Sequence, residues 1–273
     1  MFDQDPYLNT LTVDERDTII RYLTDLYDGV FSPQSIENHF ISYVGFESSE
    51  SLIELLLQQV PEKSKILDIG CGFGTFVLAA RAHSYDAFGI EPAAFEVEIA
   101  RKRLGRLCPT APAEAVFRIA SADEINDDVP TFDAITLWNV VEHIPDTSKL
   151  FQKCHSLLKP GGKLFIICPN YFAWRDEAHY HLPWSPVDFC FASRFVNKCV
   201  KLGRNPEYFL NGIVTVTNWG VLQMLHRLKF SFMDFSGLNY SVAPRLSVSS
   251  ICNFARFYFP FKQSICLIAT KDS

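Results

Sequence analysis

The sequence lacks an excess of basic residues, because 25 Lys and Arg stand against 31 Asp and Glu and give a formal net charge of −6. Proteins that bind nucleic acids usually present a basic face, so we expect no nucleic-acid partner. One local basic cluster consists of Arg101, Lys102, Arg103 and Arg106. We interpret this cluster as the solvated face of a helix.

Long apolar runs are also missing. No segment offers about 18 uninterrupted apolar residues, so we expect no membrane span. Residues 1–17 are acidic and contain no apolar stretch of the secretory-signal kind, so we expect no such signal. Internal repeats and low-complexity tracts are absent. A length of 273 residues is enough to bury a full core, so we expect one large domain or a domain with an insertion.

The eight cysteines are scattered, and no two of them have Cys-x-x-Cys spacing. This spacing argues against both a zinc site and a redox dithiol. Cys168 and Cys266 lie inside apolar runs, where cysteine acts as a small core residue. Unpaired cysteines fit a reducing compartment, and we expect the protein in the cytoplasm.

The most informative segment is Ile66–Phe76, in which apolar residues lead into glycines at positions 70, 72 and 74. A helix-compatible run, Phe76–Ala82, follows. Glycine is needed where a chain turns tightly from a buried strand into a helix, or where a ligand lies against the main chain. We interpret the segment as strand, loop and helix N-terminus of a nucleotide-type site. The alternative is that the glycines only form a tight turn.

Strand and helix patterns alternate from about residue 50 to 168. Helices are expected at 50–60 and Ala93–Leu107. The expected strands are short and nearly all apolar: Lys65–Ile69, Ala87–Glu91, Ala115–Ala120, Phe132–Leu137 and Lys163–Cys168. Such strands are typical of a parallel sheet covered on both faces by helices, which predicts a doubly wound α/β fold. Pro160-Gly161-Gly162 is expected to end the helix before the fifth strand.

The alternation stops after Pro169. Residues 170–217 are rich in aromatics and too long for an ordinary loop, so we expect an inserted lid, with a small aromatic core, an apolar acceptor pocket, or both. A helix at 218–228 and strands at 229–236 and 264–270 are expected next, the two strands as an antiparallel pair at the sheet edge. Asn253–Lys262 is interpreted as a buried edge element or, alternatively, a peripheral contact with a membrane or lipid-linked acceptor.

The residues at successive strand ends carry the functional argument, because ligands of open parallel sheets bind there. Glu91 ends the second strand, and a carboxylate at that place can accept hydrogen bonds from both ribose hydroxyls. Asp123 follows the third strand and can accept from an exocyclic amine, while Trp138 ends the fourth and can stack on a base. Each alone is more simply a loop residue. Together with the glycine loop they favour a ligand that contains adenosine.

The glycine spacing argues against a dinucleotide, whose sites use Gly-x-Gly-x-x-Gly, because the third glycine here comes one residue early. Asp68, just before the loop, would repel a pyrophosphate and suit an ammonium or sulfonium group. No Gly-Lys-Ser/Thr follows, so a P-loop is excluded.

Five motifs in this order resemble those of class I S-adenosylmethionine-dependent methyltransferases: Ile66–Phe76, Gly89–Pro92, Ala122-Asp123, Phe132–Asp146 and Leu157–Pro169. The segment Val140–Asp146 is similar to the ubiquinone-biosynthesis O-methyltransferase group. The resemblance covers about residues 50–170. It implies a mostly parallel seven-stranded, Rossmann-like methyltransferase fold, here with the aromatic-rich lid inserted after strand five. The expected domains are an N-terminal helical flap at 1–49, with Phe40, Tyr43 and Phe46 over the cofactor, and a methyltransferase domain at 50–273.

The resemblance also implies S-adenosyl-L-methionine as the cofactor and assigns roles by position. The loop residues Gly70, Cys71, Gly72 and Gly74 would bind its methionine part, anchored by Asp68. Glu91 would hold the ribose. The remaining cofactor residues are Ala122 and Asp123 at the adenine and Asn139 at the amino-acid end.

Some enzymes of the ubiquinone-biosynthesis group hold a metal near the motif that corresponds to Val140–Asp146. Glu142 and His143 match, but Asn139 stands where an acid would be expected, so we expect no metal. A hydroxyl acceptor benefits from a general base. The candidates are His143 and, on the lid, His181 or its neighbour His179. The alternatives are a structural brace for His143 and an exposed loop pair for the other two.

The first functional hypothesis is therefore an O-methyltransferase acting by in-line transfer on a small-molecule, lipid-linked or glycan-linked acceptor. The alternatives are an N- or C-methyltransferase and a non-catalytic cofactor-binding module. A nicotinamide-dependent oxidoreductase is disfavoured by the glycine spacing. No feature of the sequence indicates an oligomeric state.

Overall fold

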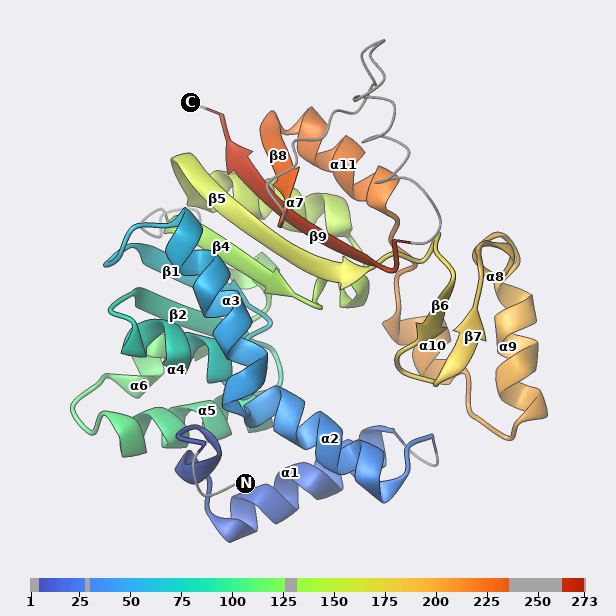
Figure 1. Cartoon of the computed structure of the whole chain (residues 1–273), viewed down its shortest axis with the longest axis horizontal. Coiled ribbons are helices and arrows are strands. Elements are labelled where there is room, and N and C mark those ends of the chain that lie inside the picture. Colours follow the sequence, from blue (N-terminus) through green and yellow to red (C-terminus); the bar gives the residue numbers. More distant parts are fainter. Residues whose placement is uncertain (1–4, 28–29, 126–131, 236–261, 273) are drawn as a thin grey trace. The chain divides into compact units, whose positions relative to one another are not determined.

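The computed structural model describes residues 5–27, 30–125, 132–235 and 262–272 (Figure 1). Its chain divides into two compact units, Met1–Thr136 and Leu137–Ser273. Each unit is described by itself below. Within the described ranges, no helix is long and apolar enough to cross a membrane. The segment Asn253–Lys262, interpreted above as an edge element or a membrane contact, lies outside the described residues except for Lys262.

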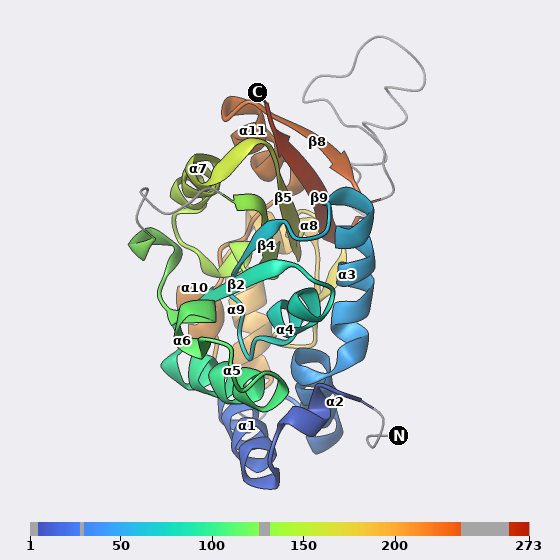
Figure 2. The same cartoon turned by 90° about the vertical axis from the view of Figure 1, so that its left-hand side faces the viewer.

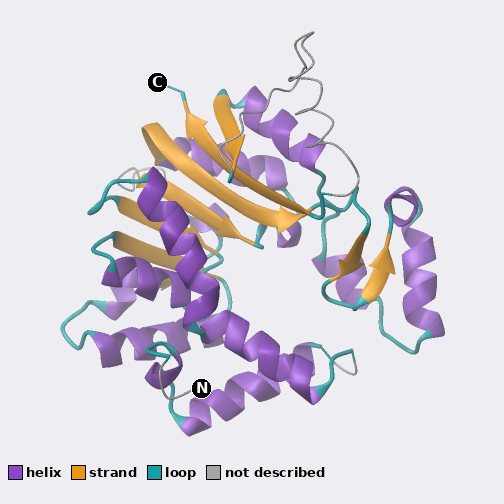
Figure 3. Cartoon of the chain, in the orientation of Figure 1, coloured by secondary structure: helices purple, strands orange, loops and turns teal. Residues whose placement is uncertain are grey.

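Seven strands form one sheet in the order β3-β2-β1-β4-β5-β9-β8, and β6 (Arg175–Glu177) and β7 (Leu182–Trp184) form a separate two-stranded sheet; Figure 3 draws all of these strands in orange. The bounds of the seven strands are β1 Lys65–Ile69, β2 Asp86–Glu91, β3 Phe117–Ile119, β4 Phe132–Trp138, β5 Leu158–Pro169, β8 Phe230–Asp234 and β9 Ser264–Lys271. β1 pairs with β2 and β2 with β3 in parallel, whereas β9 is antiparallel to both β5 and β8. The mostly parallel α/β sheet and its antiparallel edge pair are thus confirmed.

The first unit carries the helices that precede and follow β1 and β2. They are α1 Val13–Leu26, α2 Pro33–Val44, α3 Phe46–Gln59, α4 Thr75–Ala82, α5 Ala94–Leu107 and the short α6 Ala113–Val116, with 3-10 turns at Leu8–Thr10 and Ala122–Glu124. α1 packs on α2 and α3 on α4, as Figures 1 and 2 show from two sides. β1 is buried along its last four residues, which explains its apolar sequence. The division at 49/50 falls inside α3, and the N-terminal flap stays a prediction.

The second unit holds the aromatic-rich segment 170–217 between β5 and α11 (Asn218–Arg227). Its elements are β6 Arg175–Glu177, β7 Leu182–Trp184, α8 Pro186–Cys190, α9 Ala192–Lys201 and α10 Glu207–Gly212. Trp184, Phe195 and Phe209 are each less than 5% exposed, with ring centroids 4.7–5.6 Å apart. The expected small aromatic core is therefore present, and a lid role stays a prediction.

Two expected boundaries are wrong. β3 begins only at Phe117, because residues 113–116 form a helical turn. Pro160-Gly161-Gly162 does not end a helix, because α7 (Thr147–Leu157) has ended and these residues lie within β5. The Lys271 ammonium caps the end of α7 instead, donating to the carbonyls of His155 (2.7 Å) and Leu158 (2.8 Å).

The basic cluster on α5 is also not a wholly solvated face. Arg103 is 0% exposed. Arg101 donates to the Phe117 carbonyl, and Arg106 forms an ion pair with Glu15 at 2.7 Å. The periodic pattern on α5 placed these residues on a helix, but their partners come from distant parts of the chain.

The start of α4 depends on Gly74. Its φ of +80° lies in the left-handed region. A Cβ there would lie 2.7 Å from Phe117 Cζ and 2.8 Å from Ala100 Cβ. Both backbone conformation and packing therefore exclude a side chain at this position.

We expect Gly74→Ala to lower the free energy of unfolding by about 2–4 kcal/mol, because strain and overpacking add. The matched change Gly105→Ala, on α5 where an added Cβ meets nothing within 4 Å, should raise it by about 0.5–1 kcal/mol through helix propensity. Urea denaturation of both variants checks this. Equal effects of the two changes would contradict the packing argument.

Candidate functional site

The loop between β1 and α4 is built from glycines in left-handed conformations. Gly70, Gly72 and Gly74 have φ of +75°, +49° and +80°. The amides of Gly70 and Cys71 both donate to the Ile90 carbonyl of β2, at 2.9 and 3.0 Å. The loop is thereby fixed at the carboxyl end of the parallel strands, where the sequence predicted strand, loop and helix N-terminus.

The three glycines do not serve the same purpose. Gly74 is required for packing, as shown above. A Cβ on Gly72 would approach only Glu96 Oε2, at 3.2 Å. The tight-turn alternative thus accounts for Gly74, whereas the backbone at Gly72 is open to a ligand except for this carboxylate.

Three carboxyl groups surround the loop. Asp68, 2% exposed, accepts a hydrogen bond from the Thr136 hydroxyl at 2.6 Å. Glu91 accepts from the amides of Ala93 (3.0 Å) and Gly72 (3.4 Å). Glu96 was missed by the sequence analysis because it lies in the first turn of α5, outside any motif. The glycine loop therefore has acidic side chains on several sides.

Burial controls the ionisation of these acids. It raises the pKa of Asp68 to about 7, against the hydrogen bond from Thr136. Burial and then the charge of Glu91 raise the pKa of Glu96 to about 7, and burial raises the pKa of Glu91. Desolvated carboxyls crowded in this way favour a cationic ligand and disfavour a phosphate.

An aromatic group adjoins the same loop. Tyr22 of α1 donates its hydroxyl proton to Glu96 at 3.0 Å. Its ring lies 5.3 Å from Phe95 and 6.4 Å from Phe73 of the loop, centroid to centroid. Phe73 also belongs to the core of α1 and α2. The N-terminal helices therefore contact the glycine loop directly. No sequence motif predicted this contact.

The segment after β3 approaches the end of β2, because the Ala120 amide donates to the Glu91 carbonyl at 3.2 Å. Ala122 follows in the 3-10 turn and is 7% exposed, and Asp123 beside it is exposed. The order of β1, β2 and β3 thus places the predicted loop, Glu91 and this turn at one edge of the sheet. The adenine-binding roles of Ala122 and Asp123 stay predictions.

Asn139, in the second unit, follows β4 with φ of +54°. Its amide donates to the Ile167 carbonyl at 2.7 Å. Asparagine is one of the few residues that tolerate this conformation, so the backbone alone favours it here. Its expected contact with a cofactor stays a prediction.

The second unit also brings two imidazoles together. The rings of His143 and His179 lie 5.4 Å apart at 87°. His143 Nδ1 lies 3.1 Å from the Gly212 carbonyl, which can only accept, so Nδ1 carries the proton and Nε2 keeps a lone pair. Burial lowers the pKa of His143, which favours this neutral form.

His179 is held by the buried carboxylate of Glu177, 2.9 Å from its Nδ1. Burial acts to raise the pKa of Glu177, but hydrogen bonds from His179 and Tyr171 outweigh it and lower the pKa. The ionised Glu177 therefore accepts from Nδ1–H of His179 and orients its ring.

His181 lies elsewhere in this unit. Its side chain is 44% exposed, and its Nδ1 is 3.3 Å from Asp176 Oδ2, itself on a 60% exposed side chain. Of the two lid histidines, the structure brings His179 and not His181 to His143. Sequence spacing did not distinguish them, because the choice depends on the tertiary contact of His179 with His143.

Glu142, between Val141 and His143, is 1% exposed, and its Oε2 has no hydrogen-bond partner. Burial raises its pKa to about 7. Among the residues that the structure describes, no three His, Cys, Asp or Glu side chains group as a metal site.

A methyltransferase domain family matches residues 36–197 of this chain. The mitochondrial ubiquinone biosynthesis O-methyltransferase of Rattus norvegicus is 35% identical over 107 residues, 39% of this chain and 31% of the rat protein. The ubiquinone biosynthesis O-methyltransferase of Chromobacterium violaceum is 28% identical over 187 residues, 66% of this chain and 78% of that protein. The chain thus matches less than a third of the rat relative.

Two solved structures share the fold. The magnesium protoporphyrin IX methyltransferase of Synechocystis with bound SAH has a TM-score of 0.55 at 13% identity, covering 95% of this chain and 100% of that one. An S-adenosylmethionine-dependent methyltransferase of Mesorhizobium loti has a TM-score of 0.51 at 18% identity, covering 82% and 99%.

Glu142 generates a prediction on pH and stability. Its pKa is raised to about 7 in the folded chain from the ordinary 4.5, so the folded state holds the proton more tightly. The free-energy cost of burying the ionised carboxylate is absent below pH 4.5 and grows as pH rises to 7. We therefore expect Glu142→Gln to raise the free energy of unfolding by about 2–3 kcal/mol more at pH 8 than at pH 5.

Urea unfolding of wild type and variant at both pH values measures this difference. Glu207→Gln, at an exposed site in the same unit, is the control and should show no such gain. An effect of Glu142→Gln that does not change with pH would contradict the buried, uncompensated state of the carboxyl.

Proposed function

We propose a methyl-transfer reaction for this chain, which belongs to the methyltransferase domain family. The methyl donor is S-adenosyl-L-methionine, and the acceptor is a hydroxyl oxygen of a small-molecule, lipid-linked or glycan-linked substrate. The observation that carries the proposal is the left-handed glycine loop beside three carboxyls, Asp68, Glu91 and Glu96. A sulfonium donor needs such an anionic, close-fitting loop, whereas a pyrophosphate would be repelled by it.

The proposed cofactor contacts follow the chain. The backbone of Gly70, Cys71 and Gly72 meets the methionine part, and Glu91 accepts from the ribose hydroxyls. The turn at Ala122 and Asp123 meets the adenine, and Asn139 the amino-acid end. In support of this arrangement, the glycine loop and the 120–124 segment each hydrogen-bond to the end of β2.

The chemistry is an in-line displacement. The acceptor oxygen forms a bond to the methyl carbon as the bond from carbon to sulfur breaks, and S-adenosylhomocysteine leaves. The hydroxyl proton passes to an imidazole, for which Nε2 of His143 and of His179 are the candidates. Support comes from the acceptors at their Nδ1 atoms, which orient both rings. Relatives named as O-methyltransferases favour oxygen as the acceptor atom.

Calorimetry tests the cofactor assignment directly. Wild type should bind S-adenosylmethionine and S-adenosylhomocysteine and should not bind NADH. Binding of NADH without either sulfur ligand would refute the proposal. Release of S-adenosylhomocysteine with phenolic or glycosidic hydroxyl acceptors, and not with amines, then distinguishes O- from N-methylation.

The raised pKa values near the loop predict a pH dependence of cofactor preference. Asp68 and Glu96 are largely neutral below about pH 7 and charged above it. Only S-adenosylmethionine carries the sulfonium charge. Its affinity relative to S-adenosylhomocysteine should therefore rise about three- to tenfold from pH 6 to pH 8. Calorimetry with both ligands at the two pH values measures the ratio.

Glu96→Gln should flatten this rise, because one of the two titrating carboxyls is removed. Glu98→Gln, on the exposed face of the same helix, should preserve it. A ratio that is independent of pH in wild type would contradict the role given to these carboxyls.

The imidazoles give a separate kinetic prediction. We expect His143→Gln and His179→Gln each to lower kcat by about 10²–10⁴ with a hydroxyl acceptor, because the proton acceptor or its neighbour is lost. Binding of S-adenosylhomocysteine should stay within about twofold. His181→Gln should have a smaller effect on kcat than His179→Gln. A larger loss of kcat in His181→Gln than in His179→Gln would assign the catalytic role to His181.

A further inference from the structure

Arg103 is a charged residue in the interior of the first unit. It lies on α5, and its side chain is 0% exposed. An arginine carries five N–H donors in a fixed plane. All five are used here: Nε donates to Thr10 Oγ1 (2.9 Å), Nη1 to the Phe73 carbonyl (2.6 Å) and Thr75 Oγ1 (2.8 Å), and Nη2 to the carbonyls of Tyr7 (3.3 Å) and Val44 (2.9 Å).

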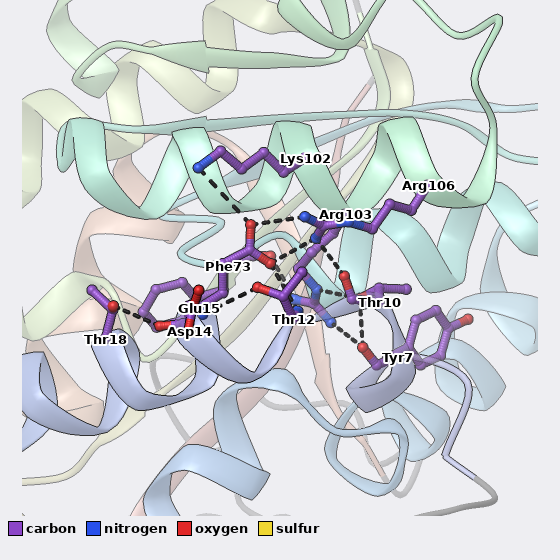
Figure 4. A network of polar contacts seen from close by, with 10 residues as sticks. All are labelled: Tyr7, Thr10, Thr12, Asp14, Glu15, Thr18, Phe73, Lys102, Arg103 and Arg106. Carbon is purple, nitrogen blue, oxygen red and sulfur yellow. Dashed lines mark hydrogen bonds and ion pairs between the residues drawn. The ribbon is translucent and has the colours of Figure 1, made fainter.

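None of these acceptors is a carboxylate. Burial lowers the pKa of Arg103 to about 9, which still leaves the guanidinium charged at neutral pH. The nearby acid Glu15 is engaged by Arg106 and Lys102 at the rim of the network (Figure 4). Asp5 and Glu15 act on the guanidinium through their charges and not through a hydrogen bond. A buried cation whose direct partners are all neutral oxygens is expensive, and an apolar side chain would fill the space at lower cost. The energetics therefore point away from a role in stability alone.

The five acceptors come from two functionally different parts of the chain. Tyr7, Thr10 and Val44 belong to the N-terminal segment, defined here as residues 5–44. Phe73 and Thr75 flank Gly74 at the end of the glycine loop. The guanidinium holds the Phe73 carbonyl, whose residue follows Gly72 directly, at 2.6 Å. One planar group thus connects the N-terminal segment to the loop backbone.

Independent contacts join the same two parts. The Thr75 hydroxyl donates to the Tyr43 carbonyl at 2.8 Å. The Phe73 ring belongs to the core formed by Ile19, Leu23 and Phe40 of α1 and α2. Glycines give the loop little conformational preference of its own, so its geometry depends on such outside contacts.

We propose that Arg103 is a positioning residue, which fixes the glycine loop in its binding conformation by tying the Phe73 carbonyl to the N-terminal segment. Cofactor affinity then depends on docking of residues 5–44. This inference rests on the proposed cofactor role of the loop. Arg103 itself holds backbone and hydroxyl oxygens, and it acts on the cofactor only through the loop.

The sharpest test removes one hydroxyl on the N-terminal side and measures the loop. Thr10→Val deletes the acceptor for Arg103 Nε, together with the hydrogen bond that the same hydroxyl donates to the Tyr7 carbonyl, while keeping shape. Thr10→Ser keeps the hydroxyl as a matched control. Arg103→Lys keeps the charge but not the planar array of donors. Lys102→Met, which removes the peripheral ion pair with Glu15 at 3.9 Å, is a second control. All variants are made in the full chain.

Two readouts are needed. In the unliganded protein, hydrogen exchange of the amides at 70–76 should quicken about tenfold in Arg103→Lys and severalfold in Thr10→Val. The Kd for S-adenosylhomocysteine, measured by calorimetry, should rise by about tenfold or more in Arg103→Lys and by about three- to fivefold in Thr10→Val. Thr10→Ser and Lys102→Met should stay within about twofold in both.

The inference is overturned if Thr10→Val and Arg103→Lys lower the melting temperature but leave the hydrogen exchange of the loop and the Kd unchanged. Arg103 would then be a structural residue. If Arg103→Lys does not fold, the Thr10 pair alone decides between these outcomes. Faster loop exchange in a protein whose wild type binds no S-adenosylhomocysteine would support the coupling and contradict the proposed function.

Discussion

The site depends on a backbone constraint: the chain leaves β1 in left-handed conformations that glycine adopts without strain. Two consecutive amides, of Gly70 and Cys71, are anchored on one carbonyl of β2. The same flexibility that permits this path also means that the loop does not hold it unaided. Its second half is fixed by packing of Gly74 against α5 and by the guanidinium of Arg103 on Phe73.

Electrostatics gives this loop its chemical preference. Asp68, Glu91 and Glu96 are withdrawn from water, and each is more easily protonated than a free carboxyl. Such groups are poor partners for a phosphate and good ones for a cation. In the other unit, partners that can only accept, the Gly212 carbonyl and the Glu177 carboxylate, orient the rings of His143 and His179 through their Nδ1 atoms.

Local patterns were sufficient for the parts of the fold in which neighbours along the chain determine structure. β1 was predicted to the residue, β2 and α5 to within one residue, and the glycine loop in full. The missed features are tertiary. Glu96 and Tyr22 meet across 74 residues, and Arg103 reaches acceptors 28 to 96 residues away. His179 differs from His181 by its ring contact with His143. No spacing rule encodes these contacts.

A crystal structure of the chain with S-adenosylhomocysteine would decide whether the glycine loop binds the cofactor. We expect the methionine part of the ligand against the backbone of Gly70–Gly74 and the Glu91 carboxylate at hydrogen-bonding distance from both ribose hydroxyls. A ligand bound away from this loop, or a Glu91 carboxylate turned from the ribose, would contradict this expectation.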